Sequence, residues 1–150
     1  MVAGRPRDPY QQFRFTIDFD GIGSARYEKG SELVCEIGEA VYWEGGSLVP
    51  EKLPGRLTFP NITLTRGASN DFDLYDWARS TANASSGRGK IDRRNGTYKQ
   101  MKYDSDPGEY FHVFDAQHRK WSSGPWDNTT DEVRIESTEL SYKYFEREAA

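Results

Sequence analysis

The stretch from Lys52 to Trp77 constrains the fold more than any other part of this sequence, because a backbone bend, a strand and a helix start are all indicated within it. Pro54 fixes its own φ and Gly55 can adopt a positive φ, so the pair predicts a sharp corner before Arg56. We expect a strand to begin directly after this corner and a helix to close the stretch.

The predicted strand changes its apolar face part of the way along. Leu57 and Phe59 share one parity, whereas Ile62 and Leu64 share the other. One extra residue must therefore be absorbed at 60–61, where a proline suits an irregular strand position. We predict a β-bulge there.

A helix over residues 70–83 follows the break at Gly67. Ser69 or Asn70 can cap it, and acidic residues in its first turn favour the positive end of the helix dipole. The residues that give this helix an apolar side are Phe72, Leu74, Tyr75, Trp77 and Ala78.

Alternating apolar and polar residues predict further strands. These strands are Gln12–Asp20, Glu32–Ile37, Tyr110–Phe114 and one that begins at Val133. Cys35 alternates with Leu33 and Ile37, which favours a buried strand residue over a reactive thiol. In the last strand the apolar positions move from odd to even numbers, which predicts a second bulge near 137–138.

Glycine and asparagine mark the connections. Asn95–Gly96 and Asp104–Gly108 both have the composition of turns. Residues 38–58 form an unusually long excursion between strands, and such an excursion commonly contacts something outside the fold. Between residues 87 and 102 the chain is locally basic, although the whole protein is acidic.

Short strands, frequent turns and one helix predict a mainly β protein, an antiparallel β-sandwich or partly open barrel with the helix on its flank. A length of 150 residues fits a single domain, which we place at 10–150 after a flexible arm at 1–9. The net charge of −4 argues against a dedicated nucleic-acid binder. With no signal-peptide-like or membrane-length apolar run, we expect cytoplasmic synthesis and no membrane insertion of the monomer.

Residue types for catalysis are present but not at the required spacing. His112 in a strand and His118 in a polar loop have no second ligand nearby in sequence, so we predict no metal, cofactor or catalytic site. A small hydrolase that uses surface carboxylates is the weakest alternative. Trp77 belongs to the predicted core, whereas the other three tryptophans can be exposed, either at subunit seams or in a monomeric carbohydrate-binding β-sandwich. These three are Trp43, Trp121 and Trp126.

Motifs spread over almost the whole chain carry a family resemblance. They are Asp8–Tyr10 with Phe13, Phe15, Ile17 and Asp20–Gly21, then Lys52–Arg56, Asn61–Gly67, Asp71, Leu74–Tyr75 and Trp77, then Trp121, Gly124–Pro125 and Glu132–Leu140. In these motifs the sequence resembles the tail-tube protein of contractile phage tails and phage-tail-like injection systems.

The resemblance implies a structural protein whose copies form hexameric rings, with sheets of neighbouring subunits joined around a central channel and rings stacked into a tube. It implies contacts with the next ring or subunit through Trp43, Glu44, Lys52, Leu53, Pro54, Gly55 and Arg56. It also implies a helix at the subunit seam, with Asp71, Leu74, Tyr75 and Trp77.

The implied partners are copies of the chain itself, a contractile sheath protein, and baseplate and tail-terminator proteins. DNA or an effector protein would pass through the channel without specific binding, past acidic residues. The particle would be a virion tail or an injection device, released from the cell or anchored to it. Residues 80–102 and Gln117–His118 depart from the family pattern, which leaves a tube-initiator paralogue at the baseplate as an alternative.

Overall fold

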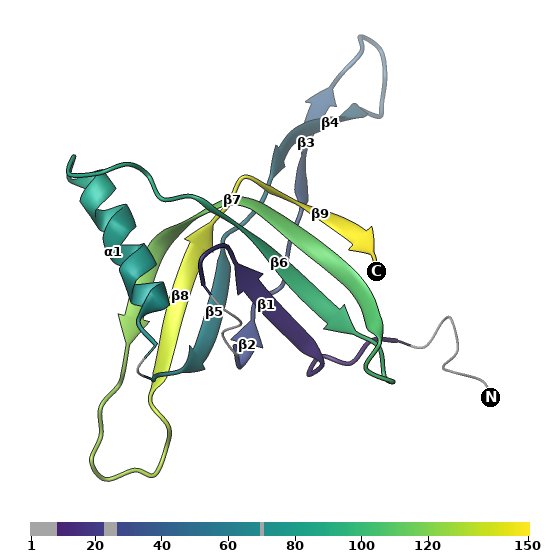
Figure 1. Ribbon diagram of the computed structural model, residues 1–150. Helices are drawn as coiled ribbons and strands as arrows, with labels where there is room; N and C mark the ends of the chain where they lie inside the picture. Colours follow the sequence, from purple (N-terminus) through teal and green to yellow (C-terminus); the bar gives the residue numbers. More distant parts are fainter. Residues whose placement is uncertain (1–8, 23–26, 70) are drawn as a thin grey trace.

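The computed structural model describes residues 9–22, 27–69 and 71–150 of the chain (Figure 1). The predicted arm at 1–9 lies almost wholly outside the described residues, as does Asn70, a candidate helix cap. The elements are β1 Phe15–Phe19, β2 Lys29–Gly30, β3 Glu36–Tyr42, β4 Glu51–Thr58, β5 Ile62–Gly67, α1 Asp73–Ser85, β6 Arg94–Met101, β7 Pro107–Ser123, β8 Ile135–Ser141 and β9 Tyr144–Ala149.

The long strand β7 organises a seven-stranded antiparallel sheet with the order β1-β6-β7-β8-β5-β2, in which β9 also pairs with β7. The first half of β7 pairs with β6 and β9, and its second half pairs with β8. We call β1-β6-β7-β9 half-sheet A and β7-β8-β5-β2 half-sheet B. The sheet curls so that β1 and β2 approach each other without pairing, which confirms the predicted partly open barrel (Figure 1).

The core lies inside this curl, with α1 packed against β7. Its fully buried side chains include Trp77, Ile17, Ile62, Leu64, Leu74, Leu140 and Val113. Gly96 lies within β6, so the predicted Asn95–Gly96 turn is wrong. A Cβ at Gly96 would lie 2.4 Å from the ring of Phe19, so the glycine makes room for a core aromatic instead.

The predicted Pro-Gly corner is also wrong, because Pro54 and Gly55 lie inside β4. The supposed loop at 38–58 is a two-stranded hairpin of β3 and β4, with a register shift between Ile37 and Glu39. A Cβ at Gly55 would lie 2.8 Å from the carbonyl carbon of Gly38, so this glycine permits close approach of two backbones. Proline is tolerated in such an irregular edge strand.

Neither predicted bulge is present. At Pro60–Asn61 the chain leaves the hairpin and enters half-sheet B, so two strands meet there rather than one bulged strand. In β8 the even positions from Glu136 to Leu140 are buried throughout, and the irregularity lies opposite, in β7 between His118 and Lys120. Val133 was counted as the first apolar position of this strand, but it is exposed and lies before the strand begins.

The helix confirms its predicted position within a few residues. Phe72 occupies the N-cap position, not Ser69 as predicted. The Asp73 N–H in the first turn donates a hydrogen bond of 3.1 Å to the Asp71 carboxylate. Cys35, predicted to be buried, is exposed because it immediately precedes the projecting hairpin.

Candidate functional site: the assembly surfaces

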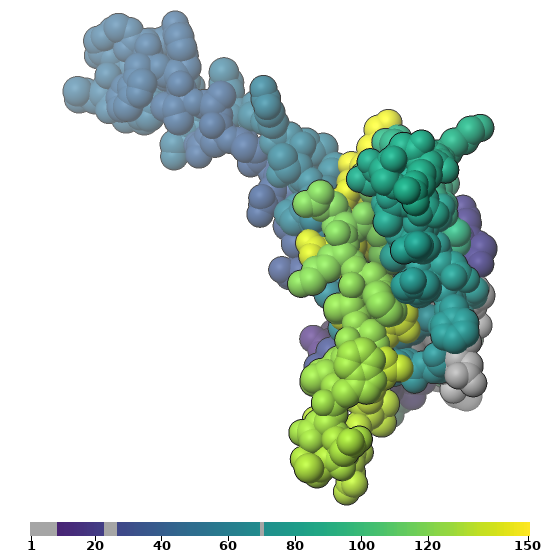
Figure 2. Space-filling view, turned by 90° about the vertical axis from the view of Figure 1, so that its left-hand side faces the viewer, coloured from purple at the N-terminus to yellow at the C-terminus, as the bar shows by residue number. Residues whose placement is uncertain are grey.

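The β3-β4 hairpin projects from the body of the protein (Figures 1 and 2). Every residue of both strands is exposed, and in the described part of the chain the strands pair only with each other. Its apolar side chains are largely in solvent, with Trp43 59% exposed, Leu48 96% and Val49 71%. A lone two-stranded hairpin is marginally stable in water, so this arrangement calls for a partner surface.

All seven hairpin residues predicted as contact residues come together on this projection. Val41 faces Lys52 and Ala40 faces Leu53 across the hairpin, and the Lys52 ammonium lies 3.7 Å from the Glu39 carboxylate. Pro54, Gly55 and Arg56 lie nearer the body, whereas Trp43 and Glu44 lie at the tip.

Half-sheet A has a free edge at β9, which pairs only with β7 among the described residues. The Ala150 N–H donates to the Gly108 carbonyl oxygen across this pair at 3.4 Å. Backbone groups alternate in direction along an antiparallel strand. The N–H groups of Phe145 and Arg147 therefore point away from β7, toward whatever lies beside the sheet.

A second free edge lies at β1, which within the described ranges pairs only with β6. The Asp20 N–H donates to the Asn95 carbonyl oxygen at 3.0 Å, so by the same alternation the N–H groups of Phe15 and Ile17 point outward. Each strand in the order β1-β6-β7-β9 is antiparallel to the one beside it. The two free edges of half-sheet A, β1 and β9, therefore run in opposite directions. The sequence could not show which strands would lie at the edges.

The outer face of half-sheet A carries more carboxylates than cationic side chains. Cross-strand pairing places Asp18, His112 and Glu146 in one row of this face, and Lys99 and Glu148 in the next. The Lys99 ammonium lies 3.6 Å from the Asp18 carboxylate, and the His112 Nε2 lies 2.6 Å from the Glu148 carboxylate.

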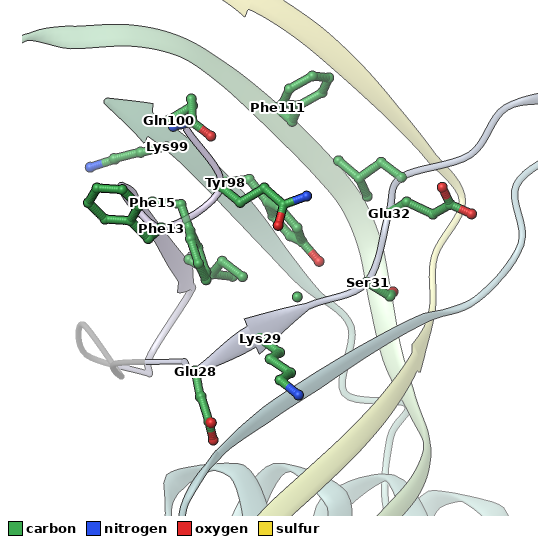
Figure 3. Close-up of a pocket in the computed structure, with 14 residues that line it drawn as sticks. Phe13, Phe15, Glu28, Lys29, Ser31, Glu32, Tyr98, Lys99, Gln100 and Phe111 are labelled. Carbon is green, nitrogen blue, oxygen red and sulfur yellow. The ribbon is translucent and has the colours of Figure 1, made fainter. Parts of the chain in front are cut away.

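An apolar cavity of about 730 Å³ lies at the seam between β1 and β2 (Figure 3). Its aromatic lining comes from Phe13, Phe15, Tyr98 and Phe111, and charged side chains stand at its rim. The Tyr98 hydroxyl is buried without a hydrogen-bond partner among the described residues, and burial raises the pKa of Tyr98 well above its usual value. We call this the seam cavity.

The predicted helix site is divided between the core and the surface. Leu74 and Trp77 are only 1% and 0% exposed, and the Trp77 Nε1 donates to the Asp92 carbonyl oxygen at 2.9 Å. Tyr75 is 41% exposed and Phe72 is 64% exposed. Of these four aromatic and aliphatic side chains, Tyr75 and Phe72 are therefore accessible to a neighbour, while Leu74 and Trp77 hold the helix in place.

A buried polar network, which sequence reasoning missed, fixes the start of α1. The Arg66 Nε lies 3.1 Å from the Glu136 carboxylate, with the two side chains 5% and 6% exposed. The Arg66 guanidinium also donates to the Asp71 carbonyl oxygen at 3.0 Å, and the Trp121 Nε1 donates to Glu136 at 2.7 Å. These contacts join the residues before α1 to β5, β7 and β8. The single hint in the sequence that Glu136 is buried is its even-numbered position, which places it on the same strand face as Leu140.

His118 was predicted in a polar loop, and the structure corrects this. The residue lies in β7, buried, with its ring edge-on to Trp77 at 4.5 Å between centroids. Its Nε2 is 2.7 Å from the Thr138 hydroxyl. Burial lowers the pKa of His118 to about 4, with a further lowering by the positive charge of Arg94.

Two of the three tryptophans predicted to be exposed have one ring face or edge in contact with another side chain. Trp121 is half-buried and packs edge-on against Tyr75 at 5.1 Å. Trp126 is exposed, but the Arg134 guanidinium lies over its ring at 4.9 Å. Within the described ranges, no three His, Cys, Asp or Glu side chains are grouped so as to hold a metal ion. No described helix has the length and apolar character needed to cross a membrane.

These features define a class of protein: a mainly β domain whose described part has open sheet edges and a projecting, exposed hairpin. The family model of the T4-like virus tail tube protein gp19 matches residues 11–146. The chain belongs to this family, which confirms the predicted resemblance and supports a tube-type structural role. No curated protein sequence matches the chain significantly.

Solved structures of the same fold include chains of an extracellular contractile injection system and of the anti-feeding prophage. A chain of the extended sheath-tube complex of an extracellular contractile injection system, PVC, superposes with a TM-score of 0.84 at 19% identity, covering 97% of this chain and 95% of that one. A chain of the anti-feeding prophage tube-terminating cap gives 0.83 at 18% identity, covering 100% and 96%. Hcp1 from Flavobacterium johnsoniae gives 0.62 at 14% identity, covering 92% and 97%.

Proposed function

We propose that copies of this chain form hexameric rings, which stack into the inner tube of a contractile phage tail or phage-tail-like injection system and serve as a conduit for DNA or protein cargo. The observation that carries this proposal is the pair of free, oppositely directed edges of half-sheet A. A sheet edge with unpaired backbone groups pairs readily with another chain.

The even number of strands in half-sheet A makes the contact between neighbouring copies antiparallel. In a cyclic arrangement β9 of one copy lies beside β1 of the next, and the two run antiparallel because each copy contributes β1, β6, β7 and β9 in alternating directions. A head-to-tail contact of this kind closes when its rotation allows, and one continuous barrel results. Barrels leave no open edges, so the completed ring is protected from further side-by-side pairing.

The seam cavity supports the same contact. It opens beside the free edge of β1, and strand addition at an edge lets alternate side chains of the added strand enter neighbouring apolar pockets (Figure 3). An incoming β9 would bring Phe145 and its neighbours toward Phe13 and Phe15. The aromatic composition of the chain, 14% Phe, Trp and Tyr, suits such subunit seams.

The acidic outer face of half-sheet A would line the channel. Asp18, Glu146 and Glu148 would repel a nucleic-acid backbone, so DNA would pass without adhering. The β3-β4 hairpin would contact the next ring or subunit, and Tyr75 on α1 would lie toward a subunit seam. The sheath, the baseplate and the tail terminator are the partners proposed for the outside and the ends of the tube.

Assembly would follow synthesis in the cytoplasm and place the protein in a virion tail or an injection particle. A tube-initiator paralogue at the baseplate, as the departures at residues 80–102 and Gln117–His118 allow, would use the same edges but would stop after one ring. The length of the assembled polymer therefore distinguishes a main tube subunit from a tube initiator.

Sedimentation velocity and negative-stain microscopy of the purified chain test the proposal. We expect rings of uniform diameter and, at higher concentration, tubes in which the rings stack. A protein that remains a 17.2 kDa monomer at every concentration contradicts it. Glycan-array binding that is lost on Trp126→Ala would instead favour the carbohydrate-binding alternative.

A further inference from the structure

A groove between α1 and β7 is lined by positively charged side chains within the described part of the chain. It encloses about 660 Å³, and among its lining residues are Arg79, Arg119 and Lys120 but no carboxylate. All three cations are exposed. Trp121 and the small side chain of Ala78 contribute apolar lining. In a protein with a net charge of −4, such a groove is suited to an acidic partner with apolar side chains.

The tip of the β3-β4 hairpin has the complementary chemistry. Glu44 and Glu51 flank the turn, and neither forms an ion pair within the described part of the chain. Trp43, Leu48 and Val49 supply exposed apolar side chains beside these carboxylates. The seam cavity is a poorer match, because its rim carries both acidic and basic residues (Figure 3).

The tip does not reach the groove of its own chain. Figure 1 shows the hairpin leaving the body at one end, while α1 lies along the outside of the second half of β7, and Figure 2 shows the tip far from the helix. A hairpin tip that occupies this groove therefore belongs to a second copy.

We infer that the hairpin tip of one copy, with Glu44, Glu51 and its apolar side chains, docks in the α1-β7 groove of another copy against Arg79, Arg119 and Lys120. This inference rests on the proposed function and assigns the groove as the receiving surface for the hairpin between subunits. Burial of the tip removes exposed apolar surface, and the charge pairs fix its orientation.

A charge exchange tests the contact. The tip reversal Glu44→Lys with Glu51→Lys places like charges against the groove, and the groove reversal Arg119→Glu with Lys120→Glu does the same against the native tip. We expect each reversal alone to lower the yield of tubes at least tenfold. Combined in one chain, the two reversals restore the attraction and should return the yield to within about twofold of wild type.

A second acidic segment provides the matched control. The loop at 124–134 carries Asp131 and Glu132, and its reversal Asp131→Lys with Glu132→Lys should not rescue the groove reversal. Rescue by the loop reversal but not by the tip reversal would overturn the inference and make the loop the occupant.

Cysteine cross-linking gives a readout that does not depend on yield. In a Cys35→Ser background, we expect a Ser47→Cys copy and a Gln117→Cys copy with different tags to form a mixed disulfide-linked dimer within tubes. Tubes that assemble without this cross-link and without charge rescue overturn the docking inference alone. Failure of the wild-type chain to form any ring overturns the proposed function and the inference together.

Discussion

Single residues decide how firmly the assembly surfaces are held, and His118 is the clearest titratable case. Its ring is buried against Trp77 and hydrogen-bonded to the Thr138 hydroxyl. Protonation of the ring is therefore less favourable in the folded protein than in the unfolded chain. The unfolded chain binds that proton near the ordinary pKa of about 6.5, whereas the folded pKa is about 4. Protons therefore favour unfolding, and stability is lost as the pH falls from about 6.5 to about 4.

We predict that this histidine removes about 2 to 3 kcal/mol from the free energy of unfolding between pH 7 and pH 4.5. His118→Gln keeps a neutral hydrogen-bonding side chain beside Thr138 and should abolish that part of the pH dependence. Urea denaturation of both proteins at the two pH values measures the difference. Equal losses in wild type and variant would show that His118 is not the source.

The buried ion pair of Arg66 and Glu136 gives a second prediction at this scale. Arg66→Ala leaves the Glu136 carboxylate buried without its charged partner, which typically costs about 3 to 5 kcal/mol. The double variant Arg66→Met with Glu136→Gln removes both charges, keeps an acceptor for Trp121 and should recover most of the loss. Denaturation midpoints would contradict this account if the double variant were as unstable as the single one.

At the scale of elements, the hairpin and the body are energetically separate. A Cβ at Gly55 would collide with the Gly38 backbone, so Gly55→Val should force β3 and β4 apart and block assembly. The free energy of unfolding of the body should change by less than about 0.5 kcal/mol, because the hairpin does not pair with the strands of the body that the structure describes.

Limited proteolysis of the monomer reports on this hairpin. Gly45→Val is the matched control for folding, since no heavy atom lies within 4 Å of a Cβ there. We expect rapid cleavage between 36 and 58 in Gly55→Val and slow cleavage in Gly45→Val. Normal tubes from Gly55→Val would show that the close approach at this position is dispensable.

The sequence predicted those elements whose apolar pattern decides their burial. The helix and the β5 strand have such patterns, because Leu74, Trp77, Ile62 and Leu64 repeat at helical or strand spacing. The hairpin escaped prediction because Pro54–Gly55 has the composition of a turn although Gly55 is needed for backbone contact. Local composition does not distinguish a glycine that bends the chain from one that makes room.

The candidate site was predictable only where residues near in sequence make it. The predicted contact residues lie on β4 and at the tip of one hairpin, although their contact with another chain stays a prediction. His118 and Glu136 were missed because their burial depends on partners 20 and 70 residues away, Thr138 and Arg66. The free edges of β1 and β9 follow from strand order, which long-range pairing sets.

At the scale of the whole molecule, we predict that the outward N–H groups of β9 donate hydrogen bonds to the neighbouring subunit. Arg147→Pro removes one such N–H at an edge facing solvent, where proline leaves the pairing with β7 intact. Arg147→Ala is the control, because it loses the same ion pair with Glu109 but keeps the N–H. Sedimentation should show rings for Arg147→Ala and monomers for Arg147→Pro, with similar melting temperatures. Rings from both variants would exclude this edge.

The most direct test is a cryo-EM reconstruction of the assembled particle at a resolution that separates strands. We predict one continuous antiparallel barrel around the channel, in which β9 of each subunit is hydrogen-bonded to β1 of the next and the acidic face of Asp18, Glu146 and Glu148 lines the interior. Subunits that keep β1 and β9 unpaired and touch only through side chains would contradict the account.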